Sequence, residues 1–265
     1  MNMPSVLERI IATKREEIER RRAATPLAEL EERIDGIPAA RDFHGALAAR
    51  IDRGEPAIIA EFKRASPSAG WIREHADPAE AATAYQSGGA ACLSVLTDAE
   101  YFGGSDEDLD RARSACRLPV IRKDFIVDPY QVFETRAMGA DALLLIVAAL
   151  DDSRLRDLSA LAFEIGLSVL VEVHDADEMD RALAFPGHLL GINNRDLHRF
   201  ETRLETSERL ARCIPDDRIG VAESGLRERA DIERMQSAGL NAFLIGEALM
   251  RGGDPASALR SLRAA

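Results

Sequence analysis

From residue 57 onward, short apolar runs alternate with longer stretches that have helical periodicity. The runs are rich in β-branched residues and recur about every 25 residues, as expected for repeated βα units. They read AIIAEFK, ACLSVLT, LPVIRKDF, ALLLIV, LSVLVEV, LLGINN, RIGVAES and AFLIGEA. None shows the strict alternation of apolar and polar residues found in a half-exposed strand. Continuous apolar runs of this kind are typical of parallel sheets covered by helices. The pattern predicts an α/β fold with eight such units, a (β/α)8 TIM barrel over residues 57–265.

The stretches between the runs are predicted to be helices. They include Pro78–Ser87, Tyr130–Met138, Ser153–Ile165, Ala176–Ala184, Thr206–Cys213 and Arg227–Ser237. Several end in a glycine shortly before the next run, such as Gly139 and Gly239, as a left-handed residue after a helix requires. An open doubly wound sheet is the alternative, but the first βα turn carries neither GxGxxG nor a P-loop.

Residues 1–50 are predicted to form a helical N-terminal extension before the first strand. Residues 5–22 place four apolar side chains on one helical face, with Ser5 and Glu8 spaced as a capping box. Thr25-Pro26 is interpreted as the N-cap and first position of a second helix, and Phe43–Ile51 as a third. We expect this extension to cover one end of the fold.

Composition is consistent with one domain over residues 1–265, since 46% of residues are hydrophobic and 30% charged. The net charge of −12 argues against nucleic-acid or anionic-membrane partners, so an anionic substrate would need a local basic pocket. Cys92, Cys116 and Cys213 are widely spaced, which suggests neither a disulfide framework nor a zinc site. The longest apolar run, Ala142–Leu150, is too short to cross a bilayer, so a cytoplasmic location is expected.

Charged residues follow the first apolar run in a pattern that suggests chemistry. Glu61 and Lys63 are two apart, so on a strand both point to the same side. A solvated edge strand would explain them equally well. In a barrel, however, the active site lies at the carboxyl ends of the strands. The residues at the end of each predicted strand can therefore be inspected for polar side chains.

Four further runs end in polar residues. These are Lys123-Asp124, Glu172, Asn193-Asn194-Arg195 and Glu223-Ser224. A single such residue is more often part of a salt bridge than a catalyst, but five strand ends together favour a shared catalytic mouth. His75, His174, His188 and His198 show neither HxH nor HExxH spacing, so they are interpreted as surface or loop residues and no metal is predicted.

The last two strand ends also carry small residues suited to phosphate. Ser224-Gly225 and Gly246-Glu247 stand where barrels commonly hold a phosphate with backbone N–H groups, and Ser66 could add a hydroxyl from across the mouth. The glycines alone could be simple turn formers. Their combination with the strand-end lysines favours a phosphate site.

The sequence resembles the indole-3-glycerol phosphate synthase family over nearly its whole length. The resemblance is carried by IIAEFKRASPSAGWI, SVLTDAEYFGGS, PVIRKDFIVDPYQV, ADALLLIVAAL, LVEVHD, LGINNRDL, VAESGL and NAFLIGEALM. It implies a TIM barrel with an N-terminal extension. It also implies cyclisation of 1-(2-carboxyphenylamino)-1-deoxyribulose 5-phosphate, with loss of carbon dioxide and water and without a cofactor.

The resemblance also implies roles for individual residues. Lys123 would be the general acid of ring closure, while Glu172 and Lys63 would serve the later dehydration. The polar residues that would orient or support these groups are Asn193, Glu61, Glu223 and Arg195. The phosphate would be held by Ser66, Ser224, Gly225, Gly246 and Glu247, and the aromatic ring enclosed by Phe102, Phe125, Leu144 and Leu197.

Two other functions are compatible with the same residues. A phosphosugar isomerase or aldolase barrel would use Lys63 or Lys123 as an acid or as a Schiff-base former. A catalytically silent barrel would only bind a small phosphorylated metabolite. In each case the protein is expected to be a monomer or a weak homo-oligomer.

Overall fold

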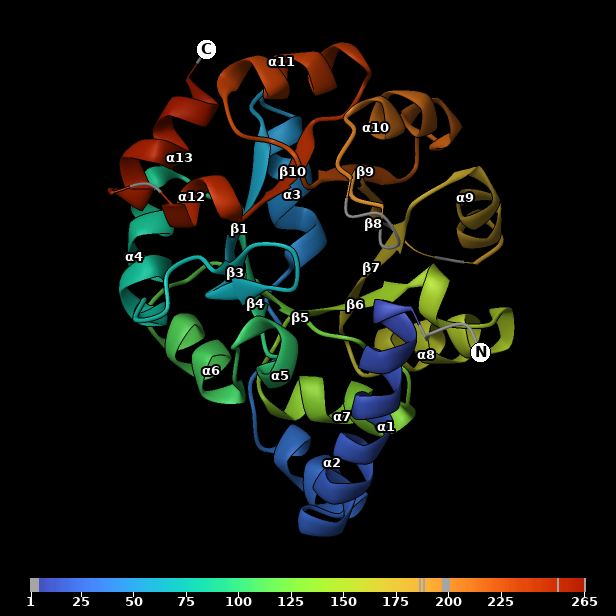
Figure 1. The fold of residues 1–265 in the computed structure, drawn as a ribbon. Coiled ribbons are helices and arrows are strands. Elements are labelled where there is room, and N and C mark those ends of the chain that lie inside the picture. Colours follow the sequence, from blue (N-terminus) through green and yellow to red (C-terminus); the bar gives the residue numbers. More distant parts are fainter. Residues whose placement is uncertain (1–4, 186, 188, 197–200, 252, 265) are drawn as a thin grey trace.

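Eight parallel strands close into a barrel in the order β1-β10-β9-β8-β7-β6-β5-β4 (Figure 1). The computed structural model describes residues 5–185, 187, 189–196, 201–251 and 253–264. The strands are β1 Ala57–Phe62, β4 Cys92–Leu96, β5 Val120–Lys123, β6 Ala142–Ile146, β7 Ser168–Val173, β8 Leu189–Asn193, β9 Ile219–Glu223 and β10 Ala242–Ile245. The predicted TIM barrel is therefore confirmed, with one strand in each of the eight apolar runs.

Helices surround the barrel and connect its strands. They are α4 Pro78–Gly88, α6 Asp106–Ser114, α7 Pro129–Ala137, α8 Asp152–Glu164, α9 Ala176–Leu183, α10 Glu205–Leu210, α11 Arg229–Ser237 and α13 Pro255–Arg263. Short helices are inserted at α5 Ala99–Phe102, η1 Val147–Ala149, η2 Ala211–Cys213 and α12 Glu247–Arg251. Local sequence explains where they begin: at α4, for example, Asp77 accepts hydrogen bonds from the N–H groups of Ala79 and Glu80, and Pro78 occupies the first turn.

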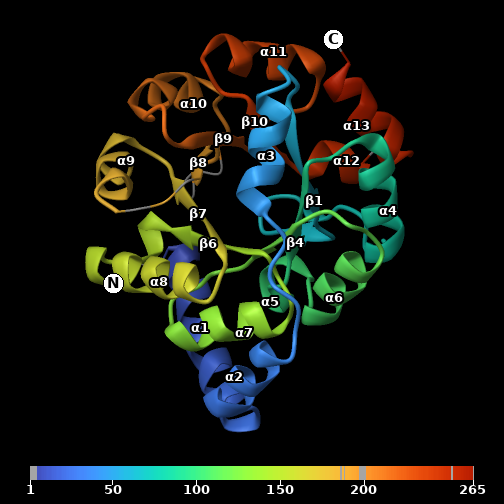
Figure 2. The ribbon, with the colours of Figure 1, turned by 180° about the vertical axis from the view of Figure 1, so that it is seen from behind.

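Side chains that alternate along each strand form two buried clusters. One set faces the outer helices, and the other fills the barrel interior, where Ile59, Ile121 and Leu170 pack together. Phe43 and Leu47 join the interior set from α3, which spans Phe43–Ile51. Helix α3 therefore closes the barrel at the amino ends of its strands, where Figure 2 shows it crossing the back of the molecule.

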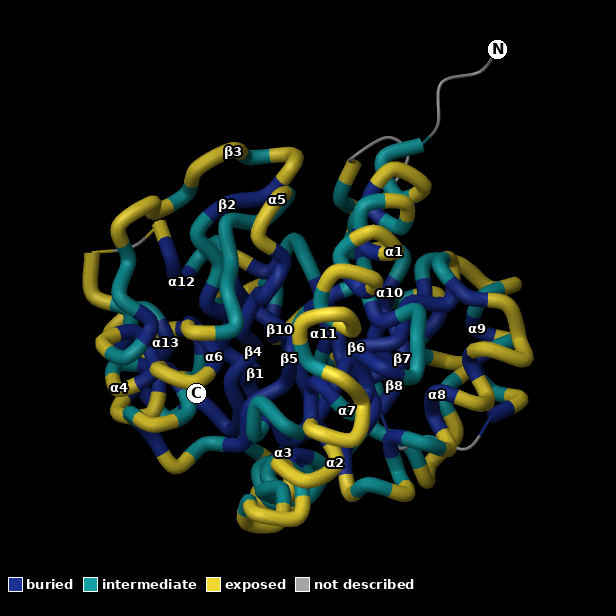
Figure 3. The backbone as a smooth tube through the Cα atoms, turned by 90° about the horizontal axis from the view of Figure 1, so that it is seen from below, coloured by how far each residue is buried: buried dark blue, intermediate teal, exposed yellow. Residues whose placement is uncertain are grey.

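The N-terminal extension reaches both ends of the barrel, whereas the sequence suggested that it covers one. Helix α1, Val6–Ala24, lies on the side opposite α3 (Figure 3). Between α1 and α3 in the chain, helix α2 spans Leu27–Asp35 and packs against α7. It begins one residue later than expected, because Pro26 has an extended ψ of 152° and is itself the N-cap.

The connection from β1 to α4 contains a short antiparallel hairpin, formed by β2 Ala65–Ser66 and β3 Gly70–Trp71. Trp71 is 57% exposed, and its ring packs close to Gly103 at the end of α5. The hairpin stands on the same side of the barrel as α1 (Figure 3). Within the described part of the chain, no helix combines the length and apolar character needed to cross a bilayer.

Candidate active site

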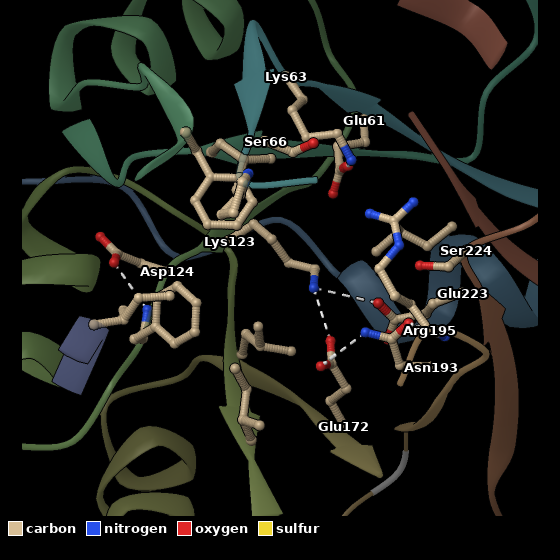
Figure 4. Close-up of a pocket in the computed structure, with 18 of the residues that line it drawn as sticks. Glu61, Lys63, Ser66, Lys123, Asp124, Glu172, Asn193, Arg195, Glu223 and Ser224 are labelled. Carbon is tan, nitrogen blue, oxygen red and sulfur yellow. Dashed lines mark hydrogen bonds and ion pairs between the residues drawn. The ribbon is translucent and has the colours of Figure 1, made fainter. Parts of the chain in front are cut away.

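Lys123 is the centre of a cluster of ionisable side chains at the carboxyl ends of the strands. Its Nζ lies 2.9 Å from Glu172 Oε2 on β7 and 3.3 Å from Glu223 Oε2 on β9. Figure 4 shows the lysine pointing between the two carboxylates. Because β5, β7 and β9 end at the same rim, residues far apart in sequence become direct contacts.

Glu61 and Lys63 form a second charged pair at the end of β1, which lies two strands from β5 and two from β9 in the barrel. Lys63 Nζ lies 2.7 Å from Glu61 Oε1, and the other carboxylate oxygen accepts a hydrogen bond of 3.2 Å from Ser94 Oγ on β4. The Glu61 side chain is only 4% exposed, so it belongs to the barrel interior and not to a solvated edge strand. The spacing of two residues indeed directs both charges inward.

Glu172 has a lysine, an amide and an imidazole around its carboxylate. Besides Lys123, Asn193 Nδ2 donates to Glu172 Oε1 over 3.1 Å, and His174 Nε2 lies 3.4 Å from the same oxygen. Asn193 is itself fixed, because its Oδ1 accepts a hydrogen bond from the backbone N–H of Arg195. The carboxylate therefore has a defined orientation within the mouth.

Two glycines make room for the buried carboxylates. A Cβ on Gly191 would lie 2.1 Å from Glu223 Oε1, and a Cβ on Gly246 would lie 2.5 Å from Glu61 Oε1. Any larger residue would displace these oxygens. Glu223 Oε1 is buried and accepts no hydrogen bond from the described residues.

The cluster shifts the proton affinities of its members in opposite directions. Burial would lower the pKa of Lys123, but Glu172, Glu223 and Glu61 together raise it above its ordinary value. Burial would likewise raise the pKa of Glu172, yet Lys123 and then His174 hold it well below the usual range.

The pKa values of Glu61 and Glu223 shift in opposite directions because different numbers of cations lie near the two carboxyl groups. Burial opposes ionisation of Glu61, but Lys63 and Lys123 keep its pKa below the ordinary value. Burial raises the pKa of Glu223 to about 8, with Glu172 adding to the shift and Lys123 opposing it. The mouth thus combines a firmly protonated lysine, a firmly ionised Glu172 and a carboxyl that titrates near neutral pH.

A buried lysine ties α1 to the strand that carries Lys123. Lys14 Nζ contacts Asp98 at 3.0 Å, Asp124 at 2.9 Å and Glu17 at 2.9 Å, and its side chain is 1% exposed. Asp124 also contacts the guanidinium of Arg122. Because α1 is anchored in this way, its first turns bring three apolar residues into the lining of the mouth, namely Val6, Leu7 and Ile10.

The same cavity has an apolar side. Phe102 and Phe125 have ring centroids 6.1 Å apart and tilted by 39°, and Leu144 lies on the barrel wall beside them. Such a surface suits an aromatic ring next to a charged mouth. Leu197, which was predicted to join this group, lies outside the described residues.

An adjoining cavity contains the predicted phosphate residues. Ser224 and Gly225 have φ values of 65° and 83°, a left-handed pair that is unusual for serine and turns this backbone sharply after β9. Lining residues include Ser224, Gly225, Gly246 and Glu247 together with Lys63 and Arg195. Ser66 lines the mouth beside them, where its Oγ accepts a hydrogen bond from the N–H of Ala69.

Glu247 and Arg195 meet at the rim of this cavity. The Glu247 carboxylate lies 2.9 Å from Arg251 one helical turn later and 3.6 Å from Arg195. Arg195 also donates to Thr202 Oγ1. The two arginines therefore partly neutralise the charge of Glu247. Helix α12, which begins at this residue, starts at the edge of the cavity.

Three contributors were not recognised in the sequence: Ser94, His174 and Lys14. His174 was interpreted as a surface or loop residue, but its side chain is only 12% exposed and faces Glu172. Its position two residues after Glu172 is the same spacing that identified Glu61 and Lys63. Lys14 lies four residues from both Ile10 and Ile18, which places it on the buried face of α1.

The chain has only three lysines among 34 basic residues, namely Lys14, Lys63 and Lys123. Two of them lie in the mouth and the third is buried beneath its rim. Within the described residues, no group of three or more His, Cys, Asp or Glu side chains is arranged to hold a metal ion.

Comparison with known proteins finds a family model that matches residues 7–262, described as indole-3-glycerol phosphate synthase. Solved structures with the same fold include thiamine phosphate pyrophosphorylase from Pyrococcus furiosus, with 14% identity, a TM-score of 0.60, and 83% of this chain and 96% of that chain covered. KGPDC from Streptococcus mutans gives 16% identity, a TM-score of 0.58 and coverages of 78% and 95%. A 3-hexulose-6-phosphate synthase has 18% identity and a TM-score of 0.61, with 78% of this chain and 98% of that chain covered.

Proposed function

This chain belongs to the indole-3-glycerol phosphate synthase family, and from that premise we propose how its residues divide the reaction between them. The enzyme is a carboxy-lyase of tryptophan biosynthesis. It converts 1-(2-carboxyphenylamino)-1-deoxyribulose 5-phosphate into indole-3-glycerol phosphate by ring closure, decarboxylation and dehydration. The observation that supports the assignment of roles is the contact of Lys123 with two buried carboxyl groups beside a cavity lined by Ser224, Gly225 and Gly246.

Lys123 is the proton donor in ring closure. A carbon–carbon bond forms between the ring carbon that bears the carboxylate and the sugar carbonyl carbon, and the carbonyl oxygen takes up the electron pair. The ammonium group stabilises this developing charge and then transfers its proton, because an alkoxide is a stronger base than an amine. Loss of carbon dioxide returns the electrons of the broken bond to the ring.

Glu172 and Lys63 complete the dehydration. The new hydroxyl leaves as water with a proton from Lys63, while Glu172 accepts the proton released from the neighbouring carbon. The low pKa of Glu172 means that it enters this step ionised and able to accept a proton. Glu61, Asn193 and Glu223 act by orienting these groups and the substrate hydroxyls.

The substrate spans both cavities. Its phosphate is proposed to lie against the backbone of Ser224, Gly225, Gly246 and Glu247, with Ser66 and Arg195 nearby. Its aromatic ring would occupy the apolar side formed by Phe102, Phe125 and Leu144. This arrangement brings the reacting carbons between Lys123 and Glu172.

We also propose that the protein works in the cytoplasm as a monomer or weak homo-oligomer, with residues 1–265 acting as one domain. Its partner is then a small phosphorylated substrate, without nucleic acid or membrane. The net charge of −12 and the two buried cysteines, Cys92 and Cys116, support this view.

The roles are tested by mixing purified protein with the carboxyphenylamino sugar phosphate and following indole absorbance and fluorescence. Lys123→Ala should lower kcat by on the order of 10²–10⁴, the usual contribution of a general acid. Lys123→Arg is the matched control: it retains the cation, but its guanidinium is too weak an acid to deliver the proton. Near wild-type turnover in Lys123→Ala would remove Lys123 from this role.

A further inference from the structure

A line of alternating charges runs from the catalytic mouth toward the surface through His174. On its inner side, His174 Nε2 lies 3.4 Å from Glu172 Oε1. On its outer side, His174 Nδ1 lies 3.0 Å from Glu178 Oε2 on α9. The imidazole thus connects a buried carboxylate with one that reaches the surface: Nδ1 makes a hydrogen bond with Glu178, and Nε2 faces Glu172 at ion-pair distance without hydrogen-bond geometry.

Glu178 is a fixed anchor for the ring. Its Oε2 accepts a second hydrogen bond of 2.8 Å from the backbone N–H of His174, while its own N–H donates to the N-cap residue Asp175. Both carboxylates together offset the cost of burial, which alone would lower the pKa of His174, and raise it to about 10. The ring is therefore a cation at neutral pH.

Other charged groups lie on the outer side of the ring. The cavity there is lined in addition by Asp175, Arg195, Asp196, Glu201, Arg203 and Arg209. These six comprise three acids and three bases, so they add little net charge around the ring. The two carboxylates in contact with the imidazole remain its dominant electrostatic partners.

We propose that His174 is a positioning residue for Glu172, which it holds ionised and correctly oriented while Lys123 changes its charge during the reaction. The inference rests on the proposed roles of Lys123 and Glu172. Once Lys123 has given up its proton in ring closure, it no longer supplies a positive charge to Glu172. His174 still supplies one, so Glu172 can remain a carboxylate until it takes up a proton in dehydration.

Two substitutions separate the charge of the ring from the presence of a nitrogen facing Glu172. In His174→Gln, the amide nitrogen can reach the place of Nε2 and keep a neutral donor toward Glu172. In His174→Asn, the shorter amide reaches only the place of Nδ1 and retains the contact with Glu178. Both variants should shift the acid limb of the kcat profile to higher pH by roughly 1–3 units, as expected when an opposite charge in contact is removed.

The plateau of kcat at high pH distinguishes the two variants. It should stay near the wild-type value in His174→Gln and fall in His174→Asn, which also loses the nitrogen that faces Glu172. His75→Gln is the matched control, since His75 is exposed, and its profile should match the wild type. An unshifted acid limb with unchanged kcat in His174→Gln would overturn the proposal.

A second readout does not depend on turnover. Long-range 1H–15N spectra of the five histidine rings, with His174 assigned from the signal that disappears in His174→Gln, should show this ring doubly protonated at pH 8. An ordinary histidine is neutral there. A neutral His174 ring would overturn the inference alone, whereas a cationic ring in a protein that forms no indole would overturn the proposed function and the catalytic role built on it.

Discussion

Gly191 offers a test of whether the position of Glu223 controls catalysis. A Cβ at this site would lie 2.1 Å from Glu223 Oε1, whereas real Cβ contacts do not fall below 3.0 Å. In Gly191→Ala the carboxylate must therefore move by about 0.9 Å. A misplacement of about 1 Å at a catalytic site can lower the rate by about 10²-fold, or roughly 2.7 kcal/mol of barrier.

The same substitution should lower the free energy of unfolding by about 1–3 kcal/mol, the usual cost of overpacking a core. Urea unfolding measures this cost, and indole formation at saturating substrate measures kcat. Gly36→Ala is the matched control, because its Cβ would have only backbone oxygens nearby, the nearest at 3.5 Å. That variant should keep the wild-type kcat.

A double-mutant cycle shows whether the effect passes through Glu223. In a Glu223→Ala background the clash partner is absent, so adding Gly191→Ala should change kcat by much less than it does in the wild type. A full 10²-fold loss in both backgrounds would show that Gly191 acts by another route. An unchanged kcat in the single variant would refute the reasoning altogether.

Three further outcomes follow from the charged contacts. Lys14→Met leaves Asp98 and Asp124 without their shared cation, so the free energy of unfolding in urea should fall by about 3–5 kcal/mol; an unchanged midpoint would contradict this. Burial opposes ionisation of Asp124, but Arg122 and Lys14 lower its pKa to about 2, so its contribution is complete above about pH 4 and lost as pH falls toward 2. Asp124→Asn should therefore flatten the decline of stability between about pH 4 and pH 2, and a parallel decline would count against it. Glu247→Ser removes a carboxylate from the phosphate cavity and should make inorganic phosphate a roughly two- to fivefold stronger inhibitor, the size of a partly exposed charge interaction; equal inhibition constants would contradict this.

The barrel could be predicted because its signal is local and repeated. Each strand is a continuous apolar run, and each is followed by a helix with a recognisable start or end. The inward direction of Glu61 and Lys63 also follows from local geometry, since side chains two apart share one face of a strand. Residues at strand ends could therefore be grouped before any distance was known.

What the sequence left open depends on contacts between distant segments. Lys14 lies on the predicted first helix, but its partners Asp98 and Asp124 lie more than eighty positions away in the sequence. Gly191 gives no sign in sequence that it makes room for Glu223. The division of the N-terminal extension between the two ends of the barrel is equally a matter of tertiary packing.

The pairing of β1 with β10 determines when activity can arise during synthesis. Ala57 pairs with Ala242, so the edge of β1 that faces β10 has no partner until β10 has been synthesised. At about 5–20 residues per second, translation of the intervening chain takes roughly 10–40 s, during which β1 has an open edge. A nascent chain stalled before β10 would already contain Lys63, Lys123 and Glu172, yet the wall that carries Lys63 would lack its neighbour. Catalytic competence is therefore acquired only after β10 has been made, in the same step that removes an edge open to aggregation.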